Sequence, residues 1–201
     1  MPPEALILAF DTAAAHCAAA VLSGDRIVAS RLEPMDKGQA ERLLPLLAEV
    51  LAEAGIGWAD LVALAVGTGP GNFTGVRIAV AGARGLALSL GIPAIGVTRL
   101  EALAHGHARP VTVIEDARRG EVYVQGFTDA GPQPARLAPA DAPGAVLGAI
   151  IGAADAVLPL TEAMARIAAT RLGASHPRPA PFYLRGADAA PPSDPPPVIL
   201  P

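Results

Sequence analysis

A glycine-rich segment between an apolar run and a long, nearly uncharged stretch constrains the fold of this chain most. Residues 61–66 predict a buried strand, residues 67–71 a turn and residues 73–90 a helix. A strand followed by a glycine-rich turn and a helix N-terminus is the layout that binds phosphate through backbone N–H groups. The segment has neither the Gly-Lys-Ser/Thr of a Walker A loop nor the GxGxxG spacing of a dinucleotide site. It therefore predicts either a phosphate contact or a tight turn capped by Asn72 or Thr74.

The helix that follows carries an unusual combination of charge and small residues. Its only charges are Arg77 and Arg84, which are seven residues apart and so share one face. Gly75, Ala79 and Gly82 form a stripe of small residues, although each interior glycine costs about 1 kcal/mol relative to alanine. Close approach of another backbone would explain that cost. A helix that is apolar nearly all round is either buried in its own chain or half covered by a partner, and the sequence leaves both open.

The rest of the chain divides into a regular first part and a proline-rich second part, with 14 of the 21 prolines after residue 131. We predict an α/β fold with an N-terminal lobe at residues 1–106, a shortened C-terminal lobe at 107–186 and a disordered tail at 187–201. Thr161 is the expected cap of the last helix. The predicted strands are 5–11, 16–23, 26–32, 61–66, 94–97, 111–115 and 121–127, and the predicted helices are 39–54, 73–90, 98–105, 145–154 and 161–172.

Composition excludes several classes of protein. The single cysteine, Cys17, cannot form an internal disulfide or build a zinc site alone. The net charge is −4, and the cations are too scattered to form the basic stripe of a nucleic-acid-binding domain. The N-terminus lacks a basic region before its apolar run, and the longest uncharged run, residues 61–76, is shorter than a membrane span. We therefore expect a cytoplasmic protein.

The apolar fraction overstates the bulk available for a core. Hydrophobic residues make up 52% of the chain, but 44 residues are alanine and aromatics make up only 3%. Such a chain must pack closely through small residues or complete its core against a partner.

Several motifs in series give the chain a family resemblance. Residues 69–78 (GPGNFTGVRI) resemble the GPGSFTGLRI signature of the bacterial TsaB family of tRNA threonylcarbamoyladenosine biosynthesis proteins. The resemblance covers residues 5–128 well and 181–185 briefly, and leaves 129–180 without support. The other matching segments are 10–12 (FDT), 41–45 (ERLLP), 96–102 (GVTRLEA), 116–123 (DARRGEVY) and 181–185 (PFYLR).

The resemblance implies a two-lobed fold like that of actin, Hsp70 and the sugar kinases, with a reduced second lobe. It implies a non-catalytic scaffold in the complex that makes N6-threonylcarbamoyladenosine at tRNA position 37. The expected partners are a TsaD-like paralogue, which carries the metal and the transfer chemistry, and a TsaE-like ATPase. It further implies a homodimer when the chain is alone and contact with tRNA only through the complex. The family pairs through helices of the first lobe, so the expected interface residues are Leu43, Leu47, Gly75, Arg77, Ala79, Gly82 and Arg84.

A vestigial nucleotide site is the other expectation from the resemblance. Asp11 and Thr12 stand where kinases of this fold place an acid and a hydroxyl near Mg²⁺ and phosphate. Three alanines follow at residues 13–15, where polar groups would be expected, so loss of nucleotide chemistry is favoured and ATP or ADP is expected only at a complex interface. The alternative function is a stand-alone actin-fold ATPase or kinase acting on a small molecule. The candidate nucleotide contacts are Asp11, Thr12, Gly69, Gly71 and Thr74.

Other reactive residues predict no catalytic or metal centre. The four histidines, His16, His105, His107 and His176, include no pair spaced i, i+4, which argues against a metalloprotease. His16 and Cys17 are neighbours on a predicted strand, so their side chains point to opposite faces and form no dyad. The Arg118-Arg119 pair predicts either a contact with phosphate, tRNA or a partner, or a solvated hairpin turn.

Overall fold

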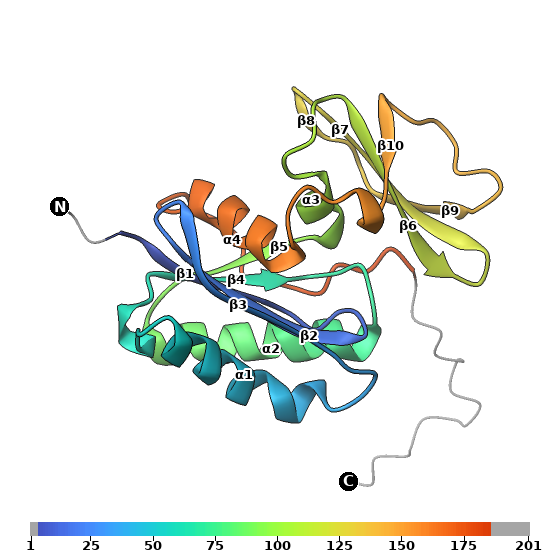
Figure 1. The fold of residues 1–201 in the computed structure, drawn as a ribbon. Coiled ribbons are helices and arrows are strands. Elements are labelled where there is room, and N and C mark those ends of the chain that lie inside the picture. The colour runs from blue at the N-terminus through green and yellow to red at the C-terminus, as the bar shows by residue number, and fades with distance from the viewer. Residues whose placement is uncertain (1–3, 186–201) are drawn as a thin grey trace, which may run out of the picture.

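Two β-sheets organise the computed structural model, which describes residues 4–185 (Figure 1). The first sheet has the strand order β3–β2–β1–β4–β5. Strands β1 to β3 form an antiparallel meander, in which short turns connect successive strands. Strands β1, β4 and β5 are parallel, so helices connect them. These strands are β1 (Leu6–Asp11), β2 (His16–Ser23), β3 (Arg26–Pro34), β4 (Ala63–Gly67) and β5 (Ala94–Val97).

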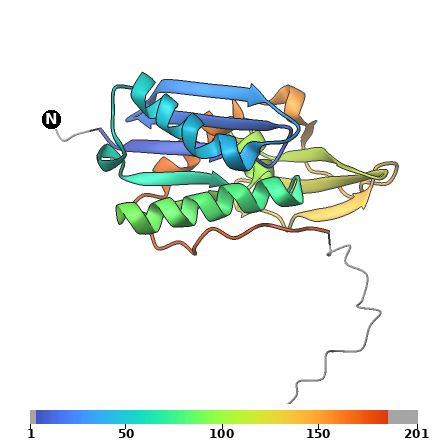
Figure 2. The ribbon, with the colours of Figure 1, turned by 90° about the horizontal axis from the view of Figure 1, so that it is seen from below.

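Helices cover both faces of this sheet. Helices α1 (Gln39–Glu53) and α2 (Phe73–Leu90) lie side by side on one face, and α4 (Leu160–Thr170) lies on the other (Figures 1 and 2). Alternate side chains of β1 point to opposite faces of the sheet. Leu8 and Phe10 pack in the hydrophobic cluster with α1, while Ile7 and Ala9 pack in the cluster with α4. All four are fully buried. A short 3₁₀ turn (Trp58–Asp60) precedes β4.

The second sheet is smaller and has the order β10–β6–β7–β8, with β9 paired to β7. Helix α3 (Arg99–Ala104) joins the two sheets, because Leu100 and Leu103 pack against Val111, Val113 and Phe127 of the second sheet. Its strands are β6 (Val111–Arg118), β7 (Glu121–Thr128), β8 (Gly131–Pro132), β9 (Arg136–Pro139) and β10 (Ala149–Ile151), followed by a 3₁₀ turn at Ala153–Asp155.

The architecture is the two-lobed α/β fold expected, with a second lobe reduced to one small sheet. Helix α4 follows that sheet in the chain but packs against β1, β2, β4 and β5. The chain therefore returns to the first lobe after residue 155, whereas the predicted division at residue 106 kept residues 107–186 together. The predicted tail at 187–201 lies outside the described residues.

The strands and helices predicted up to residue 128 are present, with shifts of a few residues at their ends. The predicted helix at 145–154 is wrong. Ile150 lies opposite Thr112, so this segment forms strand β10 parallel to β6 instead, and long-range pairing overrides its alanine-rich composition. Thr161 is not the cap of α4 either: the helix begins at Leu160 after Pro159, and Thr161 is buried in its first turn.

Candidate functional site

The glycine-rich loop packs directly on the turn between β1 and β2. A Cβ atom placed on Gly71 would overlap the Ala13 carbonyl oxygen, and one placed on Gly75 would overlap the Thr12 carbonyl oxygen. Glycine is therefore required at both positions for two backbones to meet. Gly71 and Gly75 bring the N-terminus of α2 against the end of β1, where Asp11 and Thr12 lie.

The polar groups of this junction are engaged within the chain. Asn72 caps α2, since its Oδ1 accepts hydrogen bonds from the N–H groups of Thr74 (3.0 Å) and Gly75 (3.1 Å). Asn72 N–H donates to the Ala13 carbonyl at 2.6 Å, and the Thr12 hydroxyl donates to the Gly75 carbonyl at 2.6 Å. The geometry is that of the capped strand-to-helix turn, with several of the donors that a phosphate would need already in use.

Asp11 is also satisfied internally, and by a partner that sequence reasoning missed. Its side chain is 2% exposed; Oδ1 accepts from Ala13 N–H at 2.9 Å and lies 2.9 Å from His16 Nε2. Gly67 packs so closely that a Cβ there would overlap Asp11 Oδ2. The tight β1–β2 hairpin was the available signal. Asp11 lies opposite Ala18, and His16, two residues before Ala18, is on the same face of β2.

The Asp11–His16 pair stands at the edge of a hollow between the lobes. This cavity of about 480 Å³ is lined by His16 and Ala14 from the first turn, Arg99 and Leu103 from α3, and residues 156–160 before α4. Arg99 pairs with Glu115 at 2.8 Å. Of the five candidate nucleotide contacts, Asp11 and Thr12 are buried and bonded inside the chain, Gly69 and Gly71 form the turn, and Thr74 is exposed in the first turn of α2.

The small-residue stripe of α2 faces its own chain. Gly75 meets the β1–β2 turn, Ala79 is fully buried in the core, and a Cβ on Gly82 would lie 3.1 Å from Leu43 Cδ2 of α1. Leu43 and Leu47 are buried in the same cluster. Contacts within one chain thus account for these small residues, and the stripe by itself indicates no partner.

Arg77 and Arg84 hold the C-terminal strap, which we define as residues 177–185. The strap runs along α2 (Figure 2). Arg77 Nε donates to the Tyr183 hydroxyl at 2.9 Å, and Arg84 Nε donates to the Pro179 carbonyl at 2.7 Å. Phe73 stacks with Tyr183 at a centroid distance of 5.1 Å and lies 3.7 Å from the Arg77 guanidinium carbon. Both arginines, expected at an interface with a partner, have contacts within the chain.

Apolar side chains of α1 and α2 remain exposed in the chain. Leu44 of α1 is 51% exposed and Leu88 of α2 is 84% exposed. By length and hydropathy α2 could cross a membrane, yet it packs on the sheet with 28% of its residues buried. We call this surface the α1–α2 face; its exposed residues include Leu44, Ala48, Ala81, Gly85 and Leu88.

The Arg118-Arg119 pair occupies a strained hairpin turn between β6 and β7. Within residues 4–185, these are the non-glycine residues with positive φ, at 63° and 56°. Arg118 N–H donates to Asp116 Oδ1 at 3.0 Å, and Arg185 of the strap donates to the Ala117 carbonyl at 3.0 Å. Left-handed backbone at an L-residue costs conformational energy, so the surrounding contacts must hold this turn in place.

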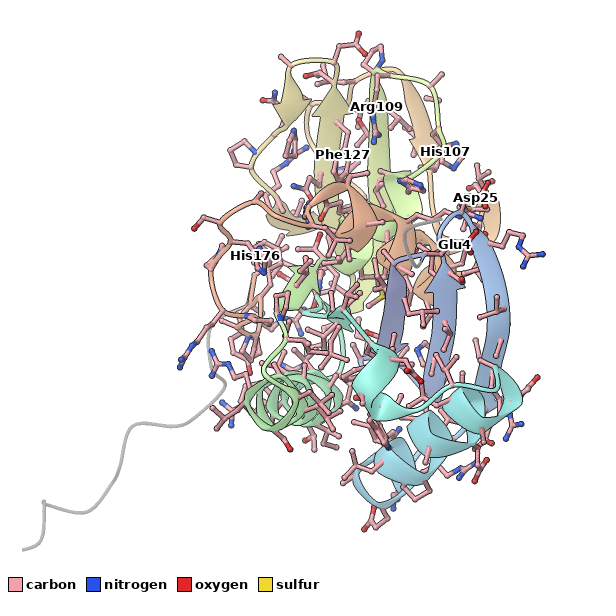
Figure 3. All side chains as sticks on the ribbon, turned by 90° about the vertical axis from the view of Figure 1, so that its left-hand side faces the viewer. Glu4, Asp25, His107, Arg109, Phe127 and His176 are labelled. Atoms are coloured by element: carbon pink, nitrogen blue, oxygen red, sulfur yellow. The ribbon has the colours of Figure 1, made fainter. Side chains whose placement is uncertain are left out.

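The remaining reactive groups form no centre. Burial, together with the charges of Glu33 and Asp11, raises the pKa of Cys17 to about 11, so its thiol stays neutral. Burial, with the charges of Arg166 and Arg109, lowers the pKa of His105. His107 and His176 lie on separate parts of the molecule (Figure 3). Among the described residues, no group of three or more His, Cys, Asp or Glu side chains could hold a metal ion.

Sequence comparisons place these features beside known proteins. The family model described as "TsaD: tRNA N6-adenosine threonylcarbamoyltransferase" matches residues 33–158. The tRNA threonylcarbamoyladenosine biosynthesis protein TsaB of Escherichia coli is 43% identical over 122 residues, covering 58% of this chain and 52% of that protein. An uncharacterized protein of Mycobacterium tuberculosis is 39% identical over 199 residues, covering 92% of this chain and 94% of its own. The chain matches about half the length of the curated TsaB relatives.

Solved structures share the whole arrangement. YeaZ from Pseudomonas aeruginosa superimposes with a TM-score of 0.73 at 27% identity, covering 90% of this chain and all of that one. A second Pseudomonas aeruginosa structure, described as an uncharacterized protein with similarity to peptidase YEAZ, gives a TM-score of 0.76 with the same identity and coverage. The likeness therefore extends over both lobes.

Proposed function

The chain belongs to the TsaB family, and from this premise we propose that it is a non-catalytic subunit of the assembly that makes N6-threonylcarbamoyladenosine at position 37 of tRNA. In this proposal it pairs with a TsaD-family protein, which carries out the threonylcarbamoyl transfer, and a TsaE-like ATPase joins them. The chain would be cytoplasmic and would meet tRNA only within the complex.

The α1–α2 face is the observation that carries the proposal. Leu88 is 84% exposed and Leu44 is 51% exposed, and Ala48, Ala81 and Gly85 of the same two helices are exposed as well. Exposed small residues allow the backbone of a second helix to approach closely, while the two leucines offer apolar area to bury. A partner of the same fold, presenting its own pair of helices, fits such a face. The same face would support a homodimer when the partner is absent.

A supporting role rather than a catalytic one agrees with the chemistry of the described residues. Asp11 is buried and bonded to Ala13 N–H and His16, and Asn72 Oδ1 accepts from two N–H groups in the first turn of α2. Cys17 is fully buried and its thiol is neutral. The interior of the first lobe thus uses its polar groups to hold α2 in place. In this proposal ATP or ADP binds only where two subunits meet.

Reconstitution tests this function. Threonylcarbamoyl transfer to tRNA would be measured with a cognate TsaD-family protein, a TsaE-like ATPase and a supply of threonylcarbamoyl-adenylate, with and without this chain. We expect product only when the chain is present. Equal product in its absence would refute the role. The competing function, a stand-alone ATPase or kinase, predicts instead Mg²⁺-dependent ATP turnover by the purified chain that is lost in Asp11→Ala.

A further inference from the structure

The cavity between the two lobes is a feature that the proposed function does not use. Its volume of about 480 Å³ lies within the range of about 300–1,000 Å³ found for small-molecule sites. It is lined by the β1–β2 hairpin, β3, α3 and the segment from residue 153 to residue 160 that leads into α4. Helix α4 covers the face of the first sheet opposite α1 and α2 (Figure 1). This interlobe cavity is therefore separate from the α1–α2 face.

The walls of the interlobe cavity are largely apolar. Leu32, Leu103, Val157 and Leu160 contribute aliphatic side chains to them. Leu103 is buried, whereas Leu32 is 59% exposed and Val157 is 55% exposed. A ligand with an apolar body would remove these two exposed side chains from water, which is favourable in proportion to the apolar area buried.

His16 supplies one polar group to the cavity, and a buried carboxylate holds it in place. Its Nε2 lies 2.9 Å from Asp11 Oδ1, and Asp11 is 2% exposed. With Nε2–H donating to the carboxylate, the neutral ring presents Nδ1 as a hydrogen-bond acceptor. Among residues 4–185, Nδ1 has no hydrogen-bond partner. It is therefore available to a hydroxyl group of a ligand.

Arg99 supplies the other polar group and uses only part of its guanidinium within the chain. Its Nε donates to Glu115 Oε2 at 2.8 Å, and Glu115 Oε1 accepts from Ala153 N–H at 2.7 Å. The terminal nitrogens Nη1 and Nη2 make no hydrogen bond to any described residue. Two guanidinium nitrogens in this geometry bind a carboxylate through parallel hydrogen bonds. Glu115 thus orients Arg99 while leaving the carboxylate-binding end open.

The charges around the cavity favour a ligand with a single negative charge. His16 pairs with Asp11, and Arg99 pairs with Glu115. Arg99 is the one arginine or lysine that lines the cavity in the described part of the chain. A triphosphate would bring several negative charges towards Asp11 and Glu115 without further cations to offset the repulsion. A monocarboxylate needs only the open end of Arg99.

We propose that the interlobe cavity binds a small organic monocarboxylate that carries a hydroxyl group and a branched apolar body. The terminal nitrogens of Arg99 bind the carboxylate, and His16 Nδ1 accepts a hydrogen bond from the hydroxyl. The aliphatic walls cover the apolar body. This inference does not rest on the proposed function, because each of its contacts lies within one chain.

The test follows binding by the ¹⁵N-labelled full chain alone in ¹H–¹⁵N NMR spectra, with racemic 2-hydroxy-4-methylpentanoate as the probe. We expect saturable shifts at residues 99–103 and 156–160, and none at Leu88. Arg99→Lys keeps the pairing with Glu115 but lacks the planar fork, so it should weaken binding about tenfold. Arg171→Lys is the matched control, because Arg171 pairs with Glu101 and does not line the cavity; its affinity should be unchanged.

A second pair of variants tests the cavity without altering its charged groups. Leu32→Trp places a large ring at an exposed strand position that lines the cavity and should abolish the saturable shifts. Ser30→Trp changes an exposed residue of the same strand outside the cavity and should bind normally. Unchanged far-UV circular dichroism of both variants would show that the fold is retained.

The choice of ligand is tested with close analogues. The neutral 2-hydroxy-4-methylpentanamide has the same shape without the charge and should bind about tenfold more weakly. The acid without the hydroxyl, 4-methylpentanoate, should also bind more weakly, and equal affinity would remove His16 from the site.

Three results would overturn the proposal as a whole. One is an affinity of Arg99→Lys or Leu32→Trp within twofold of that of the unsubstituted chain. Another is a set of shifts that never saturates. The third is tighter binding of MgATP than of the hydroxy acid at the same residues, which would make the cavity a nucleotide site. Failure of the reconstituted threonylcarbamoyl transfer would leave the inference untouched, since the titration uses this chain alone.

Discussion

Arg77 and Tyr183 are 106 positions apart in the chain, yet Arg77 Nε donates to the Tyr183 hydroxyl at 2.9 Å. The bond joins two segments of the family resemblance, the glycine-rich decapeptide at residues 69–78 and the PFYLR segment at residues 181–185. Phe182 N–H adds a backbone bond to the Thr68 carbonyl at 2.8 Å. The strap and the loop before α2 therefore support one another, although nothing in the local sequence connects them.

Tyr183→Phe should lower the free energy of unfolding by about 0.5–1 kcal/mol, because one exposed hydrogen bond is lost while the ring stack on Phe73 remains. Arg77→Ala should cost more, since it also removes the contact of the guanidinium with the Phe73 ring. Urea unfolding of both single variants and the double variant gives the coupling energy. Strict additivity of the two losses would contradict a direct interaction.

Gly75→Ala should destabilise the chain severely, by more than about 3 kcal/mol, because the added Cβ would overlap the Thr12 carbonyl oxygen and neither backbone can move freely. Gly85→Ala in the same helix is the matched control. Gly85 is exposed with nothing within 4 Å of its added Cβ, so alanine should stabilise by about 1 kcal/mol. Thermal unfolding of the two variants should give shifts of opposite sign.

The stability of the chain should fall as the pH rises from about 9 to 11. The pKa of Cys17 is raised from 9.0 to about 11 in the folded protein, so in this range the unfolded chain loses the thiol proton while the folded chain keeps it. The stabilisation is complete below pH 9 and is lost on the order of 2 kcal/mol by pH 11. Cys17→Ala should remove this component of the pH dependence, which urea unfolding at pH 8, 9.5 and 11 can measure.

Leu88→Glu should abolish association with a TsaD-family protein while leaving the monomer folded, because Leu88 is 84% exposed and has few contacts within the chain to lose. Ile150→Glu, at a residue of β10 that is 57% exposed, is the matched control and should associate normally. Analytical ultracentrifugation of each variant, alone and with the partner, measures the formation of the homodimer and of the heterodimer. Normal association of Leu88→Glu would place the interface elsewhere.

Local patterns were sufficient for most of the first lobe. The apolar run of β1, the helical spacing of α1 and the strand–turn–helix around Gly71 each depend on residues within one or two turns of each other. Asn72 was among the two expected caps for the same reason, because a cap acts on N–H groups two and three residues ahead. Strand β10 was missed because its extended backbone depends on pairing with β6, where Ile150 lies opposite Thr112. That pairing joins residues far apart in the sequence.

The meaning of the small-residue stripe was decided by the tertiary structure. The sequence established that Gly75, Ala79 and Gly82 share one side of an apolar helix. It could not establish what that side meets, because Thr12 and Leu43 are 63 and 39 positions away from their contacts at Gly75 and Gly82. The same holds for Arg77 and Arg84, which share a face by spacing but find Tyr183 and Pro179 only when the chain folds back.

The sequence by itself thus determined the helices and strands up to residue 128 and the family resemblance. The sequence reveals these features because backbone propensity, periodicity and capping each depend on residues that are close together in the chain. Only the tertiary structure decided which glycines accommodate their own chain, which arginines hold the strap and which leucines remain exposed. Those outcomes depend on contacts between residues far apart, and an apolar face looks the same in the sequence whether its own chain or a partner covers it.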